Sequence, residues 1–172
     1  TYNGYLADRI TTALDEAGHD VRRLNAGDLT FDPVLHQGYR AIQPLEPDLV
    51  TFQENLTWCE HWIVIYPLWW ASTPAVLRGL IDRAIFPSYA FEPEVDGPAV
   101  TPLLGGRTGH LVTTMDAAAS YIREAYRDAD IAEMHVAVMA FCGITPGLAL
   151  RLDEISFRSR EQLVGMADDA VG

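Results

Sequence analysis

The sequence predicts an α/β fold in which a doubly wound parallel sheet carries helices on both faces. Stretches with apolar residues at helical spacing alternate with short β-branched runs, as strands joined by helical crossovers require. The run at residues 61–66 is apolar on both faces from Trp62 onward and ends at Pro67. This pattern is typical of a central strand that helices cover on both sides.

Composition narrows the class of protein. A chain of 172 residues is expected to form a single domain, residues 1–172, and its 49% hydrophobic and 21% charged residues favour a globular fold. The net charge of −12 repels phosphate backbones and anionic lipids, which argues against nucleic acid as a partner. Cys59 and Cys142 lack the spacing of a zinc site or disulfide framework, and no apolar run is long enough to span a membrane. We expect a soluble, cytoplasmic protein without a metal.

The chain opens with a helix, an edge strand and a long loop. Residues 3–17 have helical spacing, and Gly18 is suited to end that helix. Residues 19–24 alternate in the manner of a short strand at a sheet edge. Glycines and prolines break every pattern in residues 25–47, and a loop of this length tends to be functional. We take residues 31–35 as its anchor.

Two further helices flank the central strand. Residues 48–59 place apolar side chains on one helical face, and the strand at residues 61–66 follows. After a loop at residues 67–72, Thr73 is suited to the N-cap and Pro74 to the first position of a second helix. The apolar face of this helix comprises Val76, Leu77, Leu80, Ile81, Ala84 and Ile85.

The second half repeats the alternation after an irregular stretch at residues 87–106. Residues 109–114 predict a strand that becomes polar at its end, and residues 120–127 a helix. Residues 131–141 predict a longer helix, or a helix that merges into a strand. A last strand at residues 147–152 and a closing helix at residues 156–171 complete the chain.

The ends of two predicted strands are the candidate site. Ligands of open parallel sheets bind at the carboxyl ends of the strands, where residues 67–71 and 113–118 lie. Trp69 and Trp70 suit a planar aromatic ligand, because they offer broad ring surfaces beside backbone N–H donors. The alternative is that the two rings cap the core.

These residues carry a resemblance to a known family. Pro67-Leu68-Trp69-Trp70, followed by Pro74-Ala75-Val76-Leu77-Arg78-Gly79 and Asp82-Arg83, closely resembles the signature of flavodoxin-like NAD(P)H:quinone oxidoreductases. Shorter matches extend over nearly the whole chain: Gly18-His19-Asp20-Val21, Phe31-Asp32-Pro33-Val34-Leu35, Tyr89-Ala90-Phe91, Thr113-Thr114 with Tyr121, and Phe141-Cys142-Gly143.

The resemblance implies a tightly bound, non-covalent flavin, either FAD or FMN, with NAD(P)H as co-substrate. It assigns the ring edge near N5 and O4 to Leu68, Trp69, Trp70 and Ala71, and the N1 and O2 side to Thr113, Thr114 and Met115. Pro67 and Asp116 complete the expected cofactor-binding set. Tyr121 would donate its hydroxyl to that oxygen, with Trp69 as the second catalytic residue. Tyr89 and Phe91 would bind a quinone or similar aromatic acceptor, and hydride would move in a ping-pong reaction. Relatives form homodimers with active sites between the subunits, so a homodimer is expected.

The chain departs from the family pattern in three places. Family members begin with a strand and a phosphate loop, whereas this chain starts inside that loop, so the first strand is expected to be absent. Thr1 and Asn3 match the final loop positions and would meet the flavin phosphate at a helix N-terminus. Met115-Asp116 replaces Gly-Gly, so we expect Asp116 to point to solvent or the loop to differ. Arg127 stands where some members have a histidine, and we interpret it as a solvated arginine.

Two other functions stay open at this point. Some relatives are ancillary subunits of potassium-efflux systems, and a flavodoxin-like electron carrier would share the fold. The long loop at residues 25–47 and the Tyr89 and Phe91 segment favour an enzyme, because a carrier needs an exposed flavin edge.

Overall fold

Parallel strand pairing forms the centre of the molecule. In the computed structural model, which describes residues 1–95 and 97–171, β1 (His61–Pro67) pairs with β4 (Thr108–Thr114), and β4 pairs with β5 (Thr145–Leu152). The order is β1-β4-β5. Thr114 pairs with Pro67 on one side and with Leu152 on the other, so the three strands end level at one edge of the sheet. The predicted α/β class with a parallel sheet is confirmed, but β1 is an edge strand of this sheet and not the central one.

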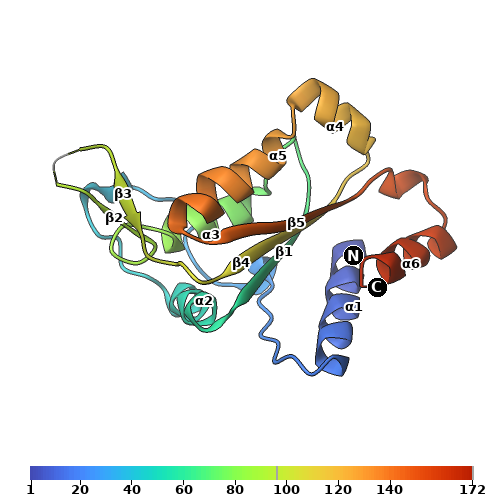
Figure 1. Ribbon diagram of the computed structural model, residues 1–172, viewed down its shortest axis with the longest axis horizontal. Coiled ribbons are helices and arrows are strands. Elements are labelled where there is room, and N and C mark those ends of the chain that lie inside the picture. The colour runs from blue at the N-terminus through green and yellow to red at the C-terminus, as the bar shows by residue number, and fades with distance from the viewer. Residues whose placement is uncertain (96, 172) are drawn as a thin grey trace.

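Helices cover both faces of the sheet, because successive strand side chains point to opposite sides. Val64 and Leu111 face a large core beneath α2 (Pro47–Trp58) and α3 (Ala75–Ala84). Ile65 and Val112 face a smaller core beneath α1 (Tyr2–Glu16) and α6 (Arg160–Asp169). Figure 1 shows α1 and α6 together, with both ends of the chain beside them. The strand pattern apolar on both faces is therefore explained by two separate cores.

The first helix ends as predicted, but the strand expected after it does not form. Gly18 adopts a φ of 87°, a conformation that glycine accepts without strain, and it follows α1 directly. Residues 19–24 pair with no strand in the part of the chain that the structure describes. The prediction of an edge strand is wrong, because alternation alone does not make a strand without a neighbour to share its hydrogen bonds.

The long loop at residues 25–46 is fastened to α3 at its predicted anchor. It contains two short 3-10 turns, Ala26–Asp28 and Gly38–Arg40, and is otherwise irregular. The buried Arg83 guanidinium donates to the carbonyl oxygens of Asp32 and Pro44 and pairs with Glu46 at 2.7 Å. Pro33 packs on Gly79, where an added Cβ would lie 2.4 Å from the proline Cβ. Gly79 and Arg83 of α3 therefore hold the loop in place.

Both predicted helices around β1 are present, with one change at the start of α3. The helix begins at Ala75 with Pro74 as its N-cap, one residue later than expected, and no side chain caps it. The Thr73 hydroxyl, which we predicted to cap the helix, donates to the Glu133 carboxylate instead. Because Thr73 binds Glu133 and does not cap the helix, α3 begins one residue later than predicted.

The second half alternates as predicted, with two irregular helices. The stretch before β4 holds a hairpin of β2 (Phe91–Pro93) and β3 (Val100–Pro102), which projects from the sheet in Figure 1. After α4 (Ala119–Tyr126), α5 (Ala129–Ile131) runs into a π-helix (η3, Ala132–Met139), so residues 131–141 form no strand. A 3-10 turn, Ile155–Phe157, precedes α6 and shortens the expected closing helix. No helix in the described ranges has the length and apolarity that crossing a membrane requires.

Candidate functional site

A cleft of about 480 Å³ opens where the three parallel strands end. The strand ends and the loops that follow them form its wall: residues 67–71 at the end of β1, residues 114–117 at the end of β4, and Ile155 with Ser156 after β5. The helix α4 closes the cleft with Tyr121, Ile122 and Tyr126. Loops far apart in the sequence meet here because the three strands end level. In an open parallel sheet, ligands usually bind at this edge.

The cleft has an apolar floor and an aromatic rim. Leu68, Met115 and Ile122 are buried beneath it and belong to the main core. Trp69 and Tyr121, by contrast, are 60% and 54% exposed, so their rings stay free to contact a ligand. The alternative that both tryptophans cap the core is wrong for Trp70, which is 99% exposed. The arrangement suits a flat molecule with an apolar face.

The rim carries a tight turn with a strained backbone. Trp69 and Ser72 exchange two backbone hydrogen bonds of 3.2 and 3.0 Å, and the residues between them, Trp70 and Ala71, both have a φ of 54°. Residues other than glycine pay about 1–2 kcal/mol for this left-handed conformation. Among the described residues, the N–H groups of Trp70 and Ala71 donate to no protein acceptor. They are available to the polar edge of a ligand.

The loops after β4 and β5 are tied to each other. The Met115 N–H donates to the Leu152 carbonyl at 3.0 Å, and the Ile155 N–H donates back to the Met115 carbonyl at 3.1 Å. The Asp116 carboxylate accepts the Ser156 N–H at 2.9 Å, and bonding to Ser156 lowers the pKa of Asp116. Asp116 is exposed, so the loop holds an ionised carboxylate at the mouth of the cleft.

Two tyrosines of α4 form one unit on the cleft wall. The rings of Tyr121 and Tyr126 meet edge to face, with centroids 5.8 Å apart. A hydrogen bond to Tyr121 raises the pKa of Tyr126, so this phenol stays neutral across the physiological range. The pair supplies hydroxyl groups beside the apolar floor.

The N-terminus of α1 lies next to the same strand ends. The Thr114 hydroxyl donates to the Asn3 side-chain oxygen at 2.6 Å, which joins α1 to the end of β4. Thr1 caps the helix by accepting the Gly4 N–H at 3.2 Å, and the first turn of α1 holds no acidic residue. Backbone N–H groups at such a helix start favour an anion.

The structure brings most of the residues predicted for the site to this cleft. Its wall contains Pro67, Leu68, Trp69, Trp70, Ala71, Thr114, Met115, Asp116 and Tyr121. Thr113 is 2% exposed and does not line the cleft, because its side chain lies within the sheet and its hydroxyl donates to the Leu150 carbonyl. Thr1 and Asn3 adjoin the wall without forming it.

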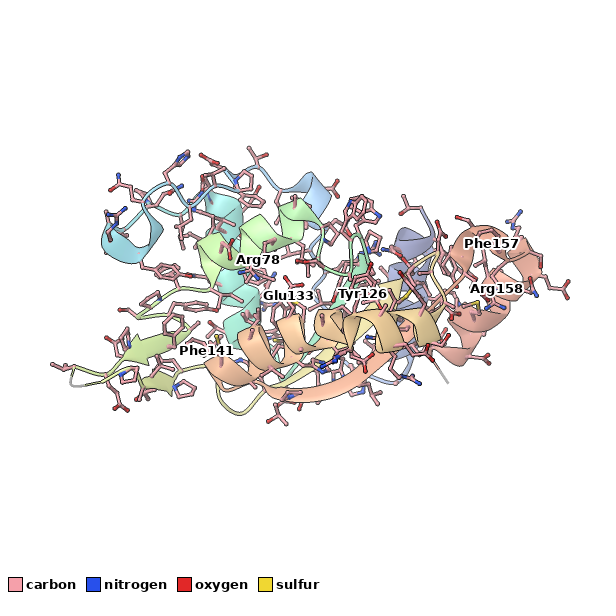
Figure 2. The ribbon with its side chains drawn as sticks, turned by 90° about the horizontal axis from the view of Figure 1, so that it is seen from above. Arg78, Tyr126, Glu133, Phe141, Phe157 and Arg158 are labelled. Carbon is pink, nitrogen blue, oxygen red and sulfur yellow. The ribbon has the colours of Figure 1, made fainter. Side chains whose placement is uncertain are left out.

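Tyr89 and Phe91 are not brought to the cleft of their own chain. The Tyr89 hydroxyl donates to the Gln53 carbonyl at 2.8 Å on α2, and Phe91 packs edge to face on Phe141 with centroids 4.9 Å apart. Tyr89 therefore lies beside α2, and Phe91 begins the β2–β3 hairpin beside Phe141. Figure 2 shows Phe141 well separated from Tyr126 of the cleft wall.

Four wall residues lie outside the ranges predicted from the sequence: Ile122, Tyr126, Ile155 and Ser156. Two signals could have found some of them. Tyr126 lies on the same short helix as Tyr121, and Ile155 and Ser156 follow the last strand just as the predicted loops follow the other two. The rule that placed the site at strand ends applies to all three strands.

Comparison with known proteins places the chain among flavodoxin-like folds. A family model described as a flavodoxin-like fold matches residues 1–169. An "Uncharacterized NAD(P)H oxidoreductase" of Haemophilus influenzae is 26% identical over 92 residues, which cover 52% of this chain and 46% of that protein. The chain thus matches about half the length of this curated relative.

Three solved structures share the fold. A Streptococcus mutans protein superposes with a TM-score of 0.84 at 23% identity, over 99% of this chain and 90% of that one. An NAD(P)H:quinone oxidoreductase from Methanothermobacter marburgensis gives 0.76 at 19% identity, over 99% and 87%. An FMN-dependent NADH-azoreductase from Bacillus anthracis, solved with FMN, gives 0.76 at 13% identity, over 99% and 88%.

Proposed function

The chain belongs to the flavodoxin-like fold family, and on this basis we propose that it is a flavin-dependent oxidoreductase that passes hydride from NAD(P)H to a quinone or related aromatic acceptor. The family match confirms the resemblance inferred from the sequence. The observation that carries the proposal is the cleft of about 480 Å³ at the level ends of β1, β4 and β5, with its apolar floor and aromatic rim. FMN and FAD both remain candidates, and the structure with FMN among those that share the fold supports FMN as the first to test.

The residues of the cleft fit a flavin ring. The buried side chains of Leu68, Met115 and Ile122 offer an apolar surface to one face of the ring. The N–H groups of Trp70 and Ala71 would bind its polar edge near N5 and O4, since they lack protein acceptors among the described residues. Fixed backbone donors of this kind need no rearrangement when charge develops on a ligand.

The opposite edge of the ring would face the loop after β4. Thr114 and Met115 would border the N1 and O2 side, and the Tyr121 hydroxyl would donate to the ring oxygen there. Asp116 fits this arrangement because its carboxylate is committed to the Ser156 N–H and stays at the exposed mouth. The negative charge of the carboxylate is thereby kept apart from the charge that a reduced flavin carries.

The flavin phosphate would bind at the start of α1. Thr1 and Asn3 adjoin the end of β4, and no carboxylate lies in the first helical turn. This local arrangement offsets the overall charge of −12, which is unfavourable for an anionic ligand.

A flavin bound here would supply an acceptor and donor for hydride, which protein side chains do not possess. The chain's contribution is to hold two flat molecules face to face. Trp69 is 60% exposed and can stack on a second ring above the cleft, so donor and acceptor would use the same place in turn. That sharing predicts ping-pong kinetics.

The roles proposed for Tyr89 and Phe91 require a homodimer. Both side chains lie away from the cleft of their own chain, so they would reach an acceptor only across an interface with a second copy. Phe91 forms an aromatic group with Tyr39 and Phe141, which are 57% and 42% exposed. This group is the surface that would be presented to the second cleft.

The proposal is tested by reconstitution and turnover. The purified protein is loaded with FMN or FAD, and NADH or NADPH oxidation is followed with and without a benzoquinone. We expect oxidation that depends on both flavin and quinone, with parallel double-reciprocal plots. Tyr121→Phe should lower kcat by about tenfold, the scale of one lost hydrogen bond, and change flavin affinity little. Tyr126→Phe is the matched control, with a smaller loss.

Two results would contradict the proposal. A protein that binds neither flavin would remove its basis. Flavin bound without turnover of any nicotinamide and quinone pair would favour an ancillary binding subunit or an electron carrier instead.

A further inference from the structure

Glu133 connects the π-helix to the strained turn at the rim of the cleft. It lies in the first turn of the π-helix, a helix type that often occurs at functional sites, and its side chain is 21% exposed. Figure 2 shows Glu133 and Arg78 facing each other between the π-helix and α3. Glu133 does not line the cleft.

Both carboxylate oxygens of Glu133 accept hydrogen bonds from the last residue of the turn and from residues that follow it. Oε2 accepts the Ser72 hydroxyl at 2.9 Å, and Oε1 accepts the Thr73 hydroxyl and the Arg78 guanidinium, each at 3.3 Å. Arg78 is itself oriented by Asp82 at 3.0 Å. Hydrogen bonds to a charged acceptor are stronger than bonds between neutral groups. Ser72 is therefore held from outside the turn.

The turn keeps its conformation only if hydrogen bonds fix both of its ends. Trp70 and Ala71 are strained at φ 54°, and Trp69 and Trp70 are 60% and 99% exposed, so the core does not support this turn. On the β1 side, the Leu68 N–H donates to the Thr114 carbonyl at 2.8 Å and fixes the entrance to the turn. On the other side, Glu133 fixes the exit through Ser72 and Thr73.

We propose that Glu133 is a positioning residue for the cleft, which holds the Trp69–Ser72 turn in its strained conformation so that Trp69 and the N–H groups of Trp70 and Ala71 stay aimed at the ligand. The proposal rests on the proposed function for the identity of that ligand. The conformational part does not, because it concerns the turn itself.

The experiment follows the turn and the ligand separately. The protein contains four tryptophans, so 5-fluorotryptophan labelling gives four ¹⁹F resonances, which Trp69→Phe and Trp70→Phe assign. Spectra of the ligand-free protein are compared for the parent, Glu133→Ala, Glu133→Gln and Ser72→Ala. FMN affinity is measured by quenching of FMN fluorescence. Glu54→Gln removes the same charge from an exposed site on α2 and is the matched control.

We expect Glu133→Ala to shift or broaden the Trp69 and Trp70 resonances while those of Trp58 and Trp62 stay in place. FMN affinity should fall about tenfold, the scale of a lost hydrogen bond to a charged group. Glu133→Gln should lose less, because one amide oxygen still accepts. Ser72→Ala should reproduce part of the Glu133→Ala effect, because Thr73 and Arg78 still bind Glu133. The double variant should lose no more than Glu133→Ala alone, since that variant already lacks the bond to Ser72. Glu54→Gln should match the parent.

Unchanged Trp69 and Trp70 resonances in a folded Glu133→Ala protein would overturn the inference, as would losses of Ser72→Ala and Glu133→Ala that add in full. If the parent does not bind FMN, the proposed function fails, and the ¹⁹F spectra of the ligand-free protein still decide whether Glu133 holds the turn.

Discussion

Trp70 combines an exposed ring with a backbone conformation that aromatic residues rarely adopt. Its side chain is 99% exposed and its φ is 54°, so it contributes nothing to the core while the turn carries strain. Strained residues persist where the surrounding structure holds them, and they concentrate at functional sites. Trp70 is thus explained by what it presents to the cleft.

The first prediction separates stability from binding at this position. Trp70→Asn should raise the free energy of unfolding by about 0.5–1 kcal/mol, because asparagine tolerates the left-handed region and no packing is lost. FMN affinity should fall, because the exposed ring is gone. Urea unfolding and FMN titration measure the two quantities. A variant that is less stable and binds FMN as before would contradict both parts.

Residue types and their order predicted most of the cleft, but not the direction of every side chain. Thr113 and Thr114 were both expected to face a ligand, yet adjacent strand residues point to opposite faces and only Thr114 does so. The register that decides between them depends on pairing with β1 and β5, which composition does not reveal. The motif around Tyr89 predicts a residue that binds the acceptor, whereas the structure shows its hydroxyl donating to the Gln53 carbonyl on α2.

At the scale of elements, α3 holds the long loop through close contact and a buried charge. Gly79 leaves room for Pro33, and the side chain of Arg83 is fully buried against Glu46 and the loop carbonyls. Gly79 and Arg83, which belong to the family signature, therefore stabilise the long loop on one face of α3.

The second prediction tests this contact with a matched pair of substitutions. Gly79→Ala should lower the free energy of unfolding by about 1–3 kcal/mol, because its Cβ would lie 2.4 Å from Pro33 and force the loop away. Gly165→Ala on α6 meets nothing within 4 Å and should be stabilising by about 0.5–1 kcal/mol. Chemical denaturation of both variants checks the contrast. Equal effects would mean that the loop does not depend on Gly79.

The elements that sequence reasoning misplaced all depend on distant partners. Residues 19–24 have the alternation of a strand but no neighbouring strand within residues 1–95 and 97–171. The strand β1 has the composition of a central strand but lies at the edge of the sheet. The π-helix is a third example, because the pattern of residues 131–141 predicts either a helix or a helix that merges into a strand. Helices with a clear apolar face, such as α2 and α3, were predicted within one or two residues because local periodicity determines them.

At the scale of the whole molecule, the half-buried His110 and the buried His135 make stability depend on pH. Burial is the main cause that lowers the pKa of His110 and of His135. A histidine in the unfolded chain binds a proton near pH 6.5, so below that pH the unfolded chain takes up more protons than the folded one. The folded state should therefore lose stability as the pH falls below about 6.5.

The third prediction uses the window between pH 5 and 6.5. Carboxyl groups with a lowered pKa, such as Asp32 and Asp116, lose their contribution only at lower pH, so histidines dominate this window. Urea unfolding of the parent should show a falling free energy there. The double variant His110→Gln, His135→Gln should show a flatter slope, and His19→Gln, an exposed control, the parent slope. An equal slope in the double variant would assign the pH dependence to other groups.

The central claim is that the ends of β1, β4 and β5 form a flavin site, and mapping FMN on the protein by ¹H–¹⁵N chemical shifts tests it most directly. We predict that FMN shifts the amide resonances of residues 68–71, 114–117 and 155–156, which line the cleft. A second cavity, of about 300 Å³, lies at His36, Gln37 and residues 41–44, and serves as the internal comparison. Shifts confined to that cavity, or no shifts at saturating FMN, would contradict the account.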